Sequence, residues 1–470
     1  MIKRRFNLKP ILKPRSVAII GASRDPEKVG HVILQNYLDS GYSGKLYPVN
    51  KNAEDVSGLK AYKSVLDIKA QIDLAVVAVP AEAVPTVLEE CGKAHVKGAV
   101  VVSGGFAEIG RDDLQERIVR IADKYGIAMI GPNCLGVMDP RSRIDTLFLP
   151  TYKLSRPKIG GVSFVSQSGA VGSTVLDLIS NEGFGLSKFI SYGNAAQIDE
   201  TDILHYLMDD DETKVIIMYI EGIKRGKEFI ELAKRLTRKK PVIVLKGGVT
   251  SEGSIAAHSH TAAMAGSAEA YDAVFRQFGF VVARDLSELM WFAKAFDTEN
   301  LPEGDRIAVI TNGGGAGVLV TDKISMYGLR LAEFSEAAEK EIKGTFSKLV
   351  AAKNPLDLVG DAGEKRYSQA MSIIQNEKNV DMIIAIVLFQ TPGADSKVAA
   401  AMIHYKTIIE KPMIVISIGA DYTEVHKKMM ESSGLPVYDS PAAAVASLRE
   451  LLKYAKYRKH ADNAGKNGKG

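Results

Sequence analysis

The sequence predicts an α/β protein made of parallel sheets with helical crossovers and divided into about three domains. Short apolar, β-branched runs alternate with longer amphipathic segments from residue 16 to residue 456, which is the pattern of strand–helix–strand units. The chain has 470 residues, of which 46% are hydrophobic, enough for several cores. We expect domains at residues 1–150, 151–298 and 299–457. A polar tail at 458–470, rich in Gly, Asn and Lys, is expected to be disordered.

The first domain is expected to be a Rossmann-like unit. Amphipathic segments at Ala81–His95 and Asp112–Tyr125 predict two of its helices. Its strands are expected at Ser16–Ile20, Lys45–Val49, Leu74–Val79, Ala99–Val102 and Ala128–Ile130.

The second and third domains resemble each other in sequence. The segment Val162–Ala170 is echoed by Ala308–Ala316, and Lys240–Gly248 is echoed by Lys411–Gly419. Two echoes in the same order predict a pair of duplicated flavodoxin-like domains. A helical stretch from Ala268 to Phe296 is expected to close the second domain.

Composition excludes several classes of function. The 60 basic and 56 acidic residues give a net charge of +4, which is too weak and too dispersed for a nucleic-acid surface. Cys91 and Cys134 lie far apart, which argues against a disulfide framework or a zinc site and fits the reducing cytoplasm. No apolar run approaches ~18 residues and no export signal is visible, so we expect a soluble cytoplasmic protein without a membrane anchor.

A glycine-containing loop follows the first strand. It runs from Gly21 to Gly30 and opens a helix at about His31, so its backbone N–H groups and Lys28 suit a nucleotide pyrophosphate. The loop has no G-x-G-x-x-G pattern, and the second strand ends at Val49-Asn50 without an acidic residue. Another adenine nucleotide is therefore favoured over a nicotinamide cofactor. The alternative is a tight turn without a ligand.

Three further loops follow strand ends of the same predicted sheet. They are Val79-Pro80, Ser103–Glu108 and Gly131–Gly136, and ligands of open α/β sheets bind at this edge. We expect them to surround one binding crevice. Cys134 is an alternative candidate as a catalytic thiol, but no neighbour in the sequence is placed to lower its pKa.

Two predicted helix starts offer phosphate sites. The segment Ser166–Ala170 lies between a strand at Val162–Val165 and a helix from about Val171. In the third domain, a strand at Ile383–Phe389 leads into Gln390–Gly393, where Pro392 suits a first helical turn. If both ends face one point, two helix dipoles would stabilise a single phosphoryl group. The alternative for each is a plain capped helix.

The stretch from Lys246 to Ser267 sets His258 and His260 among small residues directly after a predicted strand. Such a loop can bring an imidazole and backbone N–H groups close to an anion. Glu221 follows the apolar run Val215–Ile220 and could orient the imidazole. A surface histidine and a solvated or helix-capping carboxylate are the alternatives.

Taken in order, these motifs resemble the NDP-forming acyl-CoA synthetases, a family that includes succinyl-CoA synthetase, and most closely the α subunits of archaeal-type ADP-forming acetyl-CoA synthetases. The resemblance covers residues from about 10 to 455. Two positions depart from the family pattern, Ala262 where glycine is common and Ala268 where aspartate is common. The motifs that carry the resemblance are Gly21-Ala-Ser, Gly131-Pro-Asn-Cys-Leu-Gly, Ser166-Gln-Ser-Gly-Ala, Tyr219-Ile-Glu-Gly and Ser259-His-Thr-Ala-Ala-Met-Ala-Gly-Ser.

The resemblance implies an acid–thiol ligase that converts acyl-CoA, phosphate and ADP to carboxylate, CoA and ATP through acyl phosphate and phosphohistidine. It implies that His260 is phosphorylated and that Glu221 steadies it. The residues expected to bind phosphate are Ser166, Gln167, Ser168, Gly169, Ala170, Thr391 and Gly393. Those expected to bind CoA are Gly21, Ala22, Ser23, Lys28, Asn50, Val79, Pro80, Ser103 and Asn133.

No nucleotide-grasping pattern and no Walker-type loop is visible in the sequence. The resemblance therefore implies a separate ATP-grasp β subunit that holds Mg²⁺ with ADP or ATP, in an assembly such as α2β2. Two other classes of protein are alternatives. One is a CoA-binding regulatory protein without catalysis, and the other is an NAD-dependent Rossmann oxidoreductase, which would leave two domains without a role.

Overall fold

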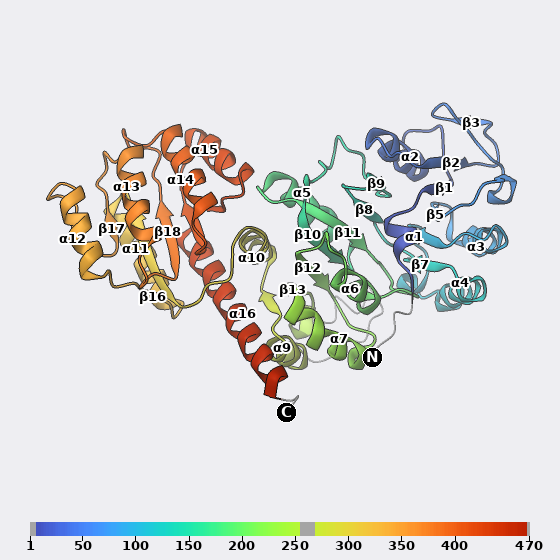
Figure 1. Cartoon of the computed structure of the whole chain (residues 1–470). Coiled ribbons are helices and arrows are strands. Elements are labelled where there is room, and N and C mark those ends of the chain that lie inside the picture. Colours follow the sequence, from blue (N-terminus) through green and yellow to red (C-terminus); the bar gives the residue numbers. More distant parts are fainter. Residues whose placement is uncertain (1–5, 254–267, 468–470) are drawn as a thin grey trace. The chain divides into compact units, whose positions relative to one another are not determined.

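The computed structural model describes residues 6–253 and 268–467, with side chains up to 463. Its strands form three separate sheets of predominantly parallel strands and one small hairpin (Figure 1). By their internal contacts, the described residues form two compact units. Unit 1 contains the first two sheets and extends to Arg284, and unit 2 begins at Asp285 and also takes in Glu182–Phe184.

The first sheet is entirely parallel, with strand order β2-β1-β5-β6-β7. Its central strands are apolar throughout because helices and loops cover both faces, and Val17, Ile19 and Val76 are fully buried. The strands are β1 (Ser16–Ile20), β2 (Lys45–Val49), β5 (Leu74–Val77), β6 (Gly98–Val101) and β7 (Ala128–Ile130), and the hairpin consists of β3 (Asp55–Val56) and β4 (Leu59–Lys60). The helices are α1 (Lys9–Leu12), α2 (Val29–Asp39), α3 (Val84–Lys93) and α4 (Asp112–Tyr125), with short 3₁₀ turns at Val65–Asp67, Ala81–Ala83 and Ala107–Ile109.

The second sheet has seven strands in the order β14-β13-β12-β10-β11-β8-β9. Its parallel strands are β10 (Ile159–Ser166), β11 (Leu186–Ser191), β12 (Val215–Ile220), β13 (Val242–Lys246) and β14 (Val281–Ala283). Its helices are α5 (Gly169–Asn181), α6 (Glu200–Met208), α7 (Gly226–Lys239) and α9 (Ala268–Gln277).

An antiparallel hairpin extends this sheet beyond β11. It consists of β8 (Val137–Asp139) and β9 (Ile144–Asp145), so residues that precede the predicted boundary at 150 pair with the second sheet and not with the first. Wholly buried Lys188 on β11 lies 3.8 Å from Asp139 of β8 and 2.8 Å from Asp210. The hairpin covers an edge of the sheet that would otherwise be unpaired.

The third sheet is parallel, with the order β16-β15-β18-β19-β20 and with β17 also paired to β15. Helix α16 contacts both α10 and α11, and α12 to α15 form a second row. The strands are β15 (Arg306–Thr311), β16 (Arg330–Leu331), β17 (Leu356–Asp357), β18 (Met382–Ile386), β19 (Met413–Ile416) and β20 (Val437–Tyr438). The helices are α10 (Leu286–Thr298), α11 (Gly314–Met326), α12 (Glu336–Thr345), α13 (Glu364–Gln375), α14 (Ser396–Ile408), α15 (Asp421–Ser432) and α16 (Pro441–Asn467).

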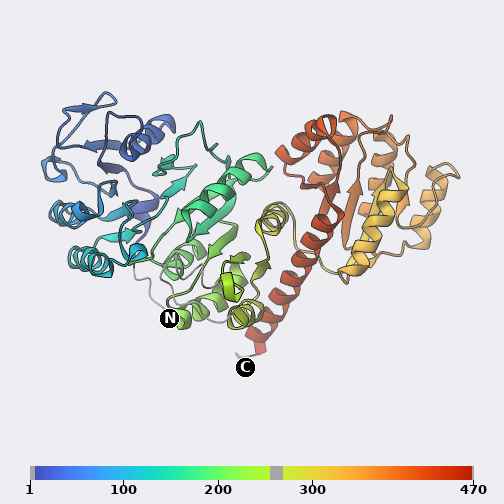
Figure 2. The ribbon, with the colours of Figure 1, turned by 180° about the vertical axis from the view of Figure 1, so that it is seen from behind.

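Two expectations about the ends of domains are wrong. The stretch expected to be helical from Ala268 to Phe296 is interrupted by β14, and its last helix, α10, packs on α16 of unit 2, where the rings of Phe296 and Tyr454 lie 5.6 Å apart. The tail expected to be disordered is helical through Asn467, and Figure 2 shows α16 continuing past the end of the third sheet. The alanines, lysines and arginine of this segment have high helix propensity, which outweighs its polar composition.

Candidate active site

Five parallel strands in each of the three sheets share one order. When the β8–β9 hairpin and the short strand β17 are left out, each sheet reads 2-1-3-4-5, so the chain crosses to opposite sides after the first and third of these strands. A crevice at the carboxyl ends of these two strands is where open α/β sheets bind ligands. The three switch points therefore lie at β1/β5, β10/β12 and β15/β18, and some of the motifs singled out from the sequence follow these strands.

The first switch point is shaped by two close backbone approaches. Gly21 has φ +95°, and a Cβ there would lie 2.2 Å from the Ala78 carbonyl oxygen. A Cβ at Gly30 would lie 2.0 Å from the Gly21 carbonyl oxygen, so glycine lets the start of α2 approach the loop. Ala22 is buried and Ser23 is half-buried. The first residues of the loop, Gly21 to Ser23, therefore carry little side-chain bulk, which suits a phosphate site.

Lys28 and Asn50 have different roles at this loop. Lys28 is exposed and is the N-cap residue of α2, and its ammonium has no hydrogen-bond or ion-pair partner among the residues that the structure describes. The Asn50 side chain donates to the Ala22 carbonyl oxygen at 2.7 Å and accepts from Asn52 N at 2.7 Å. Asn50 therefore holds the loop in place, whereas Lys28 can reach an anion.

The other residues predicted to bind CoA gather at the same edge of the first sheet. The Ser103 hydroxyl donates to the Val79 carbonyl oxygen at 2.5 Å, and Asn133 N donates to the Ser103 carbonyl oxygen at 2.8 Å. Pro80 and Asn133 are exposed. The structure thus brings the three predicted loops together around one edge.

Cys134 lies beside Asn133 but is unsuited to be a thiolate nucleophile. It is buried, and burial raises the pKa of its thiol to about 12. Its Sγ lies 3.4 Å from the Val101 carbonyl oxygen, to which it donates. The alternative of a catalytic thiol therefore has no support in this geometry.

A polar chain joins this edge to the second sheet. The Asn194 amide donates to Glu108 Oε2 at 2.5 Å and accepts from Asn133 Nδ2 at 3.2 Å. The Asn194 carbonyl oxygen accepts from Lys224 Nζ at 2.8 Å, three residues beyond Glu221. Sequence reasoning missed Asn194 and Lys224, because no local motif marks a residue that bridges two loops.

The second switch point places the predicted phosphate loop beside Glu221. Ser166, Gln167 and Ser168 are buried at the end of β10, Gly169 begins α5 and Ala170 is exposed on its first turn. The first N–H groups of a helix have no acceptor within the helix. They and the helix dipole therefore favour an anion at this end of α5.

Glu221 is buried, with 6% of its surface exposed. Its backbone N–H donates to Gln167 Oε1 at 2.7 Å, and the N–H of Gly222 donates to the same oxygen at 3.2 Å. The Tyr219 hydroxyl donates to Glu221 Oε1 at 3.2 Å. A side chain of the predicted phosphate loop therefore fixes the turn that carries the predicted carboxylate.

The third switch point lies in unit 2 and has the same construction. Asn312 Oδ1 accepts from Leu388 N at 2.9 Å, and its Nδ2 donates to Thr391 Oγ1 at 2.9 Å. Gly393 is half-buried, and a Cβ there would lie 2.3 Å from the Asp361 carbonyl oxygen. The two predicted phosphate residues of this unit, Thr391 and Gly393, thus belong to a tightly packed loop.

The expected helix start at Pro392 is wrong. Helix α14 begins at Ser396, and its N-cap is Asp395, whose side chain accepts from Lys397 N at 2.9 Å. The Asp395 cap sets the start of the helix, and Pro392 lies in the preceding turn. His258 and His260 both lie outside the described residues.

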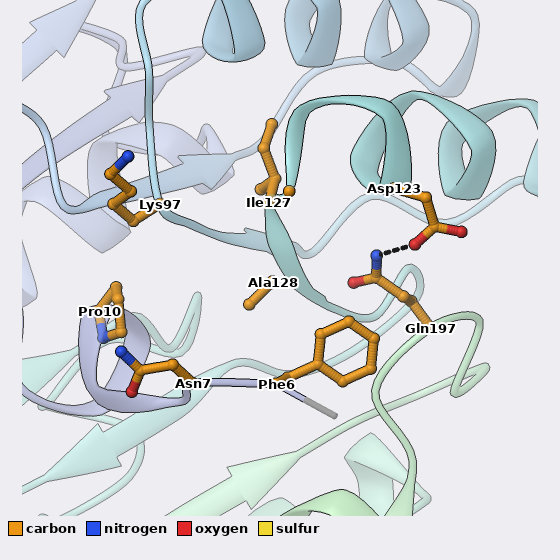
Figure 3. A pocket seen from close by; sticks show the side chains of 9 residues that line it. Phe6, Asn7, Pro10, Lys97, Asp123, Ile127, Ala128 and Gln197 are labelled. Carbon is orange, nitrogen blue, oxygen red and sulfur yellow. Dashed lines mark hydrogen bonds between the residues drawn. The ribbon is translucent and has the colours of Figure 1, made fainter. Parts of the chain in front are cut away.

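Two open cavities among the described residues lie at strand starts, away from these switch points. One, of about 500 Å³, opens at the amino ends of β6 and β7, at the opposite edge of the first sheet. Figure 3 shows its Asp123 and Gln197, which are joined by a hydrogen bond of 2.7 Å. The other, of about 860 Å³, lies at the amino ends of β15 and β18. Within the part of the chain that the structure describes, no helix is long and apolar enough to span a bilayer.

Family models match the chain in three consecutive parts. A CoA binding domain matches residues 15–140, a succinyl-CoA ligase like flavodoxin domain matches residues 159–296, and a ligase-CoA domain matches residues 307–459. Together with the three switch points, these matches define a ligase of the CoA-dependent class.

Individual relatives are similar over nearly the whole chain. The α subunit of acetate–CoA ligase [ADP-forming] II from Pyrococcus furiosus is 40% identical, over 94% of this chain and 97% of the relative. Acetate–CoA ligase [ADP-forming] from Methanocaldococcus jannaschii is 39% identical, over 96% of this chain and 64% of the relative. The solved dinucleotide forming acetyl-coenzyme A synthetase 1 of Ca. Korarchaeum cryptofilum, in complex with phosphate and ADP, is 35% identical with a TM-score of 0.91, over 97% of this chain and 99% of that one. The chain belongs to the family of ADP-forming acetate–CoA ligases.

Proposed function

We propose that this chain is the α subunit of a cytoplasmic ADP-forming acetyl-CoA synthetase, which converts acetyl-CoA, phosphate and ADP to acetate, CoA and ATP. The observation that carries the proposal is the second switch point, where a helix N-terminus suited to phosphate is tied through Gln167 to the turn of Glu221. In this proposal, the first sheet with its helices binds CoA, and the second and third sheets with their helices form the two ligase domains.

The first step of the proposed reaction forms acetyl phosphate. A phosphate oxygen attacks the thioester carbonyl carbon, the C–S bond breaks, and CoA leaves as the thiol after taking up a proton. The loop from Gly21 to Ser23 and Lys28 would hold the CoA phosphates, while Ser103 and Asn133 border the same edge. The N–H groups of Gly169 and Ala170 at the start of α5 would hold the attacking phosphate.

In the second step, His260 takes the phosphoryl group. A neutral ring nitrogen attacks phosphorus, the P–O bond to the acetyl oxygen breaks, and acetate leaves. The carboxylate of Glu221 would accept the N–H of the other ring nitrogen, which fixes the tautomer and stabilises the developing imidazolium. An oxygen of the ADP β-phosphate then attacks phosphorus, the N–P bond breaks, and ATP forms.

We place ADP and Mg²⁺ on a partner subunit of the ATP-grasp type. Among the residues that the structure describes, no group of three His, Cys, Asp or Glu side chains is placed to hold a metal ion, so no step on this chain is assigned to Mg²⁺. The relative from Methanocaldococcus jannaschii extends well beyond the part that this chain matches, which leaves room for such a module in a fused form. An α2β2 assembly is our proposal for the separate form.

The first loop supports CoA over a nicotinamide cofactor. Dinucleotide-binding folds place an acidic side chain after the second strand to accept from a ribose hydroxyl, whereas this chain has Asn50, whose amide is bonded within the loop. No observation in the structure favours a regulatory protein without catalysis over the ligase.

Labelling with radioactive phosphate tests the proposal. Incubated with acetyl-CoA and labelled phosphate, the full chain should form a protein-bound phosphate that is labile in acid and stable in base. His260→Asn should abolish the label and His258→Asn should retain it. Glu221→Gln should slow labelling by roughly a hundredfold and leave CoA affinity unchanged, because it replaces a charged acceptor with a neutral one that stabilises the developing imidazolium less. Label that survives in His260→Asn would refute the assignment.

A further inference from the structure

The second and third sheets are copies of one framework that differ in charge at the switch point. The Ser166 hydroxyl donates to the Ser168 carbonyl oxygen at 2.7 Å, and the Thr311 hydroxyl donates to the Gly313 carbonyl oxygen at 3.0 Å. The side-chain oxygen of the next residue, Gln167 or Asn312, accepts from the backbone N–H after the neighbouring strand. These matching contacts identify equivalent positions without reference to sequence similarity.

The equivalences extend to the third and fourth strands of each sheet. Because Gln167 accepts from Glu221 N and Asn312 accepts from Leu388 N, Glu221 corresponds to Leu388. In the first copy, Ile220 is paired with Lys246. In the second copy, Val387 precedes Leu388 as Ile220 precedes Glu221. Ile386 is paired with Ile416, so the next residues, Val387 and Ser417, are neighbours, and the Ser417 hydroxyl donates to the Val387 carbonyl oxygen at 2.8 Å. Lys246 therefore corresponds to Ser417.

The framework folds with a leucine and a serine where the first copy has a glutamate and a lysine. The fold does not require the two charges, and burying them costs free energy. Glu221 is 6% exposed and Lys246 is 8% exposed. A buried charged pair that a copy of the same fold does without is best explained by chemistry at that site.

The surroundings of Lys246 hold its ammonium at the end of β13. Its Nζ lies over the ring of Tyr271, 4.9 Å from the centroid, and donates to the Gly247 carbonyl oxygen. The Tyr271 hydroxyl in turn accepts from Ile223 N at 3.0 Å, two residues after Glu221. Burial lowers the pKa of Lys246, and the negative charge of Glu221 opposes that shift, so the two groups attract each other.

We propose that Lys246 is a positioning residue for phosphoryl transfer and acts through Glu221, which rests on the function proposed above. The ammonium of Lys246 and the carboxylate of Glu221 attract each other at the ends of the paired strands β13 and β12. This attraction orients Glu221, whose oxygens would accept the imidazole N–H of the phosphorylated histidine. Lys246 thereby positions Glu221 and leaves CoA binding to the first domain.

The test measures the rate of phosphate labelling from acetyl-CoA and inorganic phosphate on the full chain. Lys246→Met, which keeps the length of the side chain without its charge, should slow labelling by about tenfold or more at saturating substrate. Lys246→Arg should retain most of the rate, and neither change should alter the dissociation constant for CoA. A wild-type rate in Lys246→Met would overturn the proposal.

A double-variant cycle separates positioning from a general structural role. If Lys246 acts through Glu221, adding Lys246→Met to Glu221→Gln should change the rate by less than about twofold, because there is no carboxylate left for the ammonium to attract. Additive losses would overturn the proposal. Lys240→Met is the matched control, since Lys240 precedes the same strand and its buried ammonium donates to the carbonyl oxygens of Leu207 and Asp210. It should lower thermal stability without changing the labelling rate.

If Lys246→Met does not fold, Lys246→Gln takes its place in the cycle with the same expected outcomes. Failure of the proposed function has a different outcome, because the wild-type chain would then carry no phosphate at all. Label on the wild type together with an unaffected Lys246→Met would refute only the role of Lys246.

Discussion

Buried lysines in unit 1 serve different purposes that their contacts distinguish. Lys188 is wholly enclosed and donates to Asp210 at 2.8 Å and to Glu212 at 2.7 Å, so it joins strands and loops of the second sheet. Lys246 lies at a strand end beside Glu221, at the edge where ligands of this fold bind. Burial alone therefore does not distinguish these two lysines, whereas their places in the sheet do.

Lys28 should contribute to CoA affinity through a charge-assisted contact with a phosphate. Lys28→Ala is expected to weaken CoA binding by on the order of 1–3 kcal/mol, measured by calorimetry. Lys97→Ala is the matched control, because Lys97 is also exposed but precedes β6 at the opposite edge of the sheet. Equal affinities for Lys28→Ala and the wild type, with the fold intact, would count against this placement.

At the residue scale, the sequence predicts the position of those candidate site residues that lie within continuous motifs. Gly21, Ser166 and Glu221 each follow a predicted strand, and the structure places each of them at a switch point. Lys246 differs in kind, since its importance appears only when equivalent positions in two domains are compared. The second pair of similar segments, Lys240–Gly248 and Lys411–Gly419, already contains this difference, with lysine in one copy and serine in the other.

At the element scale, the sequence predicts the strands that have apolar runs, but it does not predict which other strands they pair with. Four of the five predicted strands of the first sheet begin where expected, because burial on both faces demands an uninterrupted apolar run. The hairpin of β8 and β9 was missed because two- and three-residue strands leave no periodicity to detect. The first echo was also misaligned by one residue, since hydrogen bonds equate Ser166 with Thr311 and not with Asn312.

The ion-pair cluster around Lys188 should be sensitive to acid through Glu212. Burial by itself would raise the pKa of Glu212, but hydrogen bonds from Lys188 and Lys13 lower it from 4.5 to about 2. Because the folded-state pKa lies below the unfolded one, this carboxylate contributes its full stability above about pH 4.5, and the contribution is lost as the pH falls toward 2. Glu212→Gln should therefore lower Tm at neutral pH and show a smaller loss of Tm on acidification.

Differential scanning calorimetry across that pH range measures both quantities. Glu116→Gln serves as the control, because Glu116 is 71% exposed and pairs only with Arg120 on the surface of α4, where such pairs contribute little. An acid-induced loss of Tm as large in Glu212→Gln as in the wild type would show that other groups dominate.

At the scale of the whole molecule, the chain is expected to carry out only the first half of the reaction. Alone, it should bind CoA and form acetyl phosphate from acetyl-CoA and phosphate, but it should make no ATP when ADP is added. Addition of an ATP-grasp subunit should restore ATP synthesis, which a coupled luminescence assay measures. Full-rate ATP synthesis by the purified single chain would reveal a nucleotide site on it.

The placement of the β8–β9 hairpin also orders events during synthesis of the chain. The last strand of the first sheet is complete at Ile130, and the hairpin leaves the ribosome next, before any parallel strand of the sheet that it joins. Lys188, the ion-pair partner of Asp139, is translated later. Until then the carboxylate of Asp139 remains solvated. The first sheet can thus form before the second sheet. The hairpin keeps an unpaired strand edge, with which β11 pairs when it is translated, so the second sheet starts from the hairpin next to the first sheet.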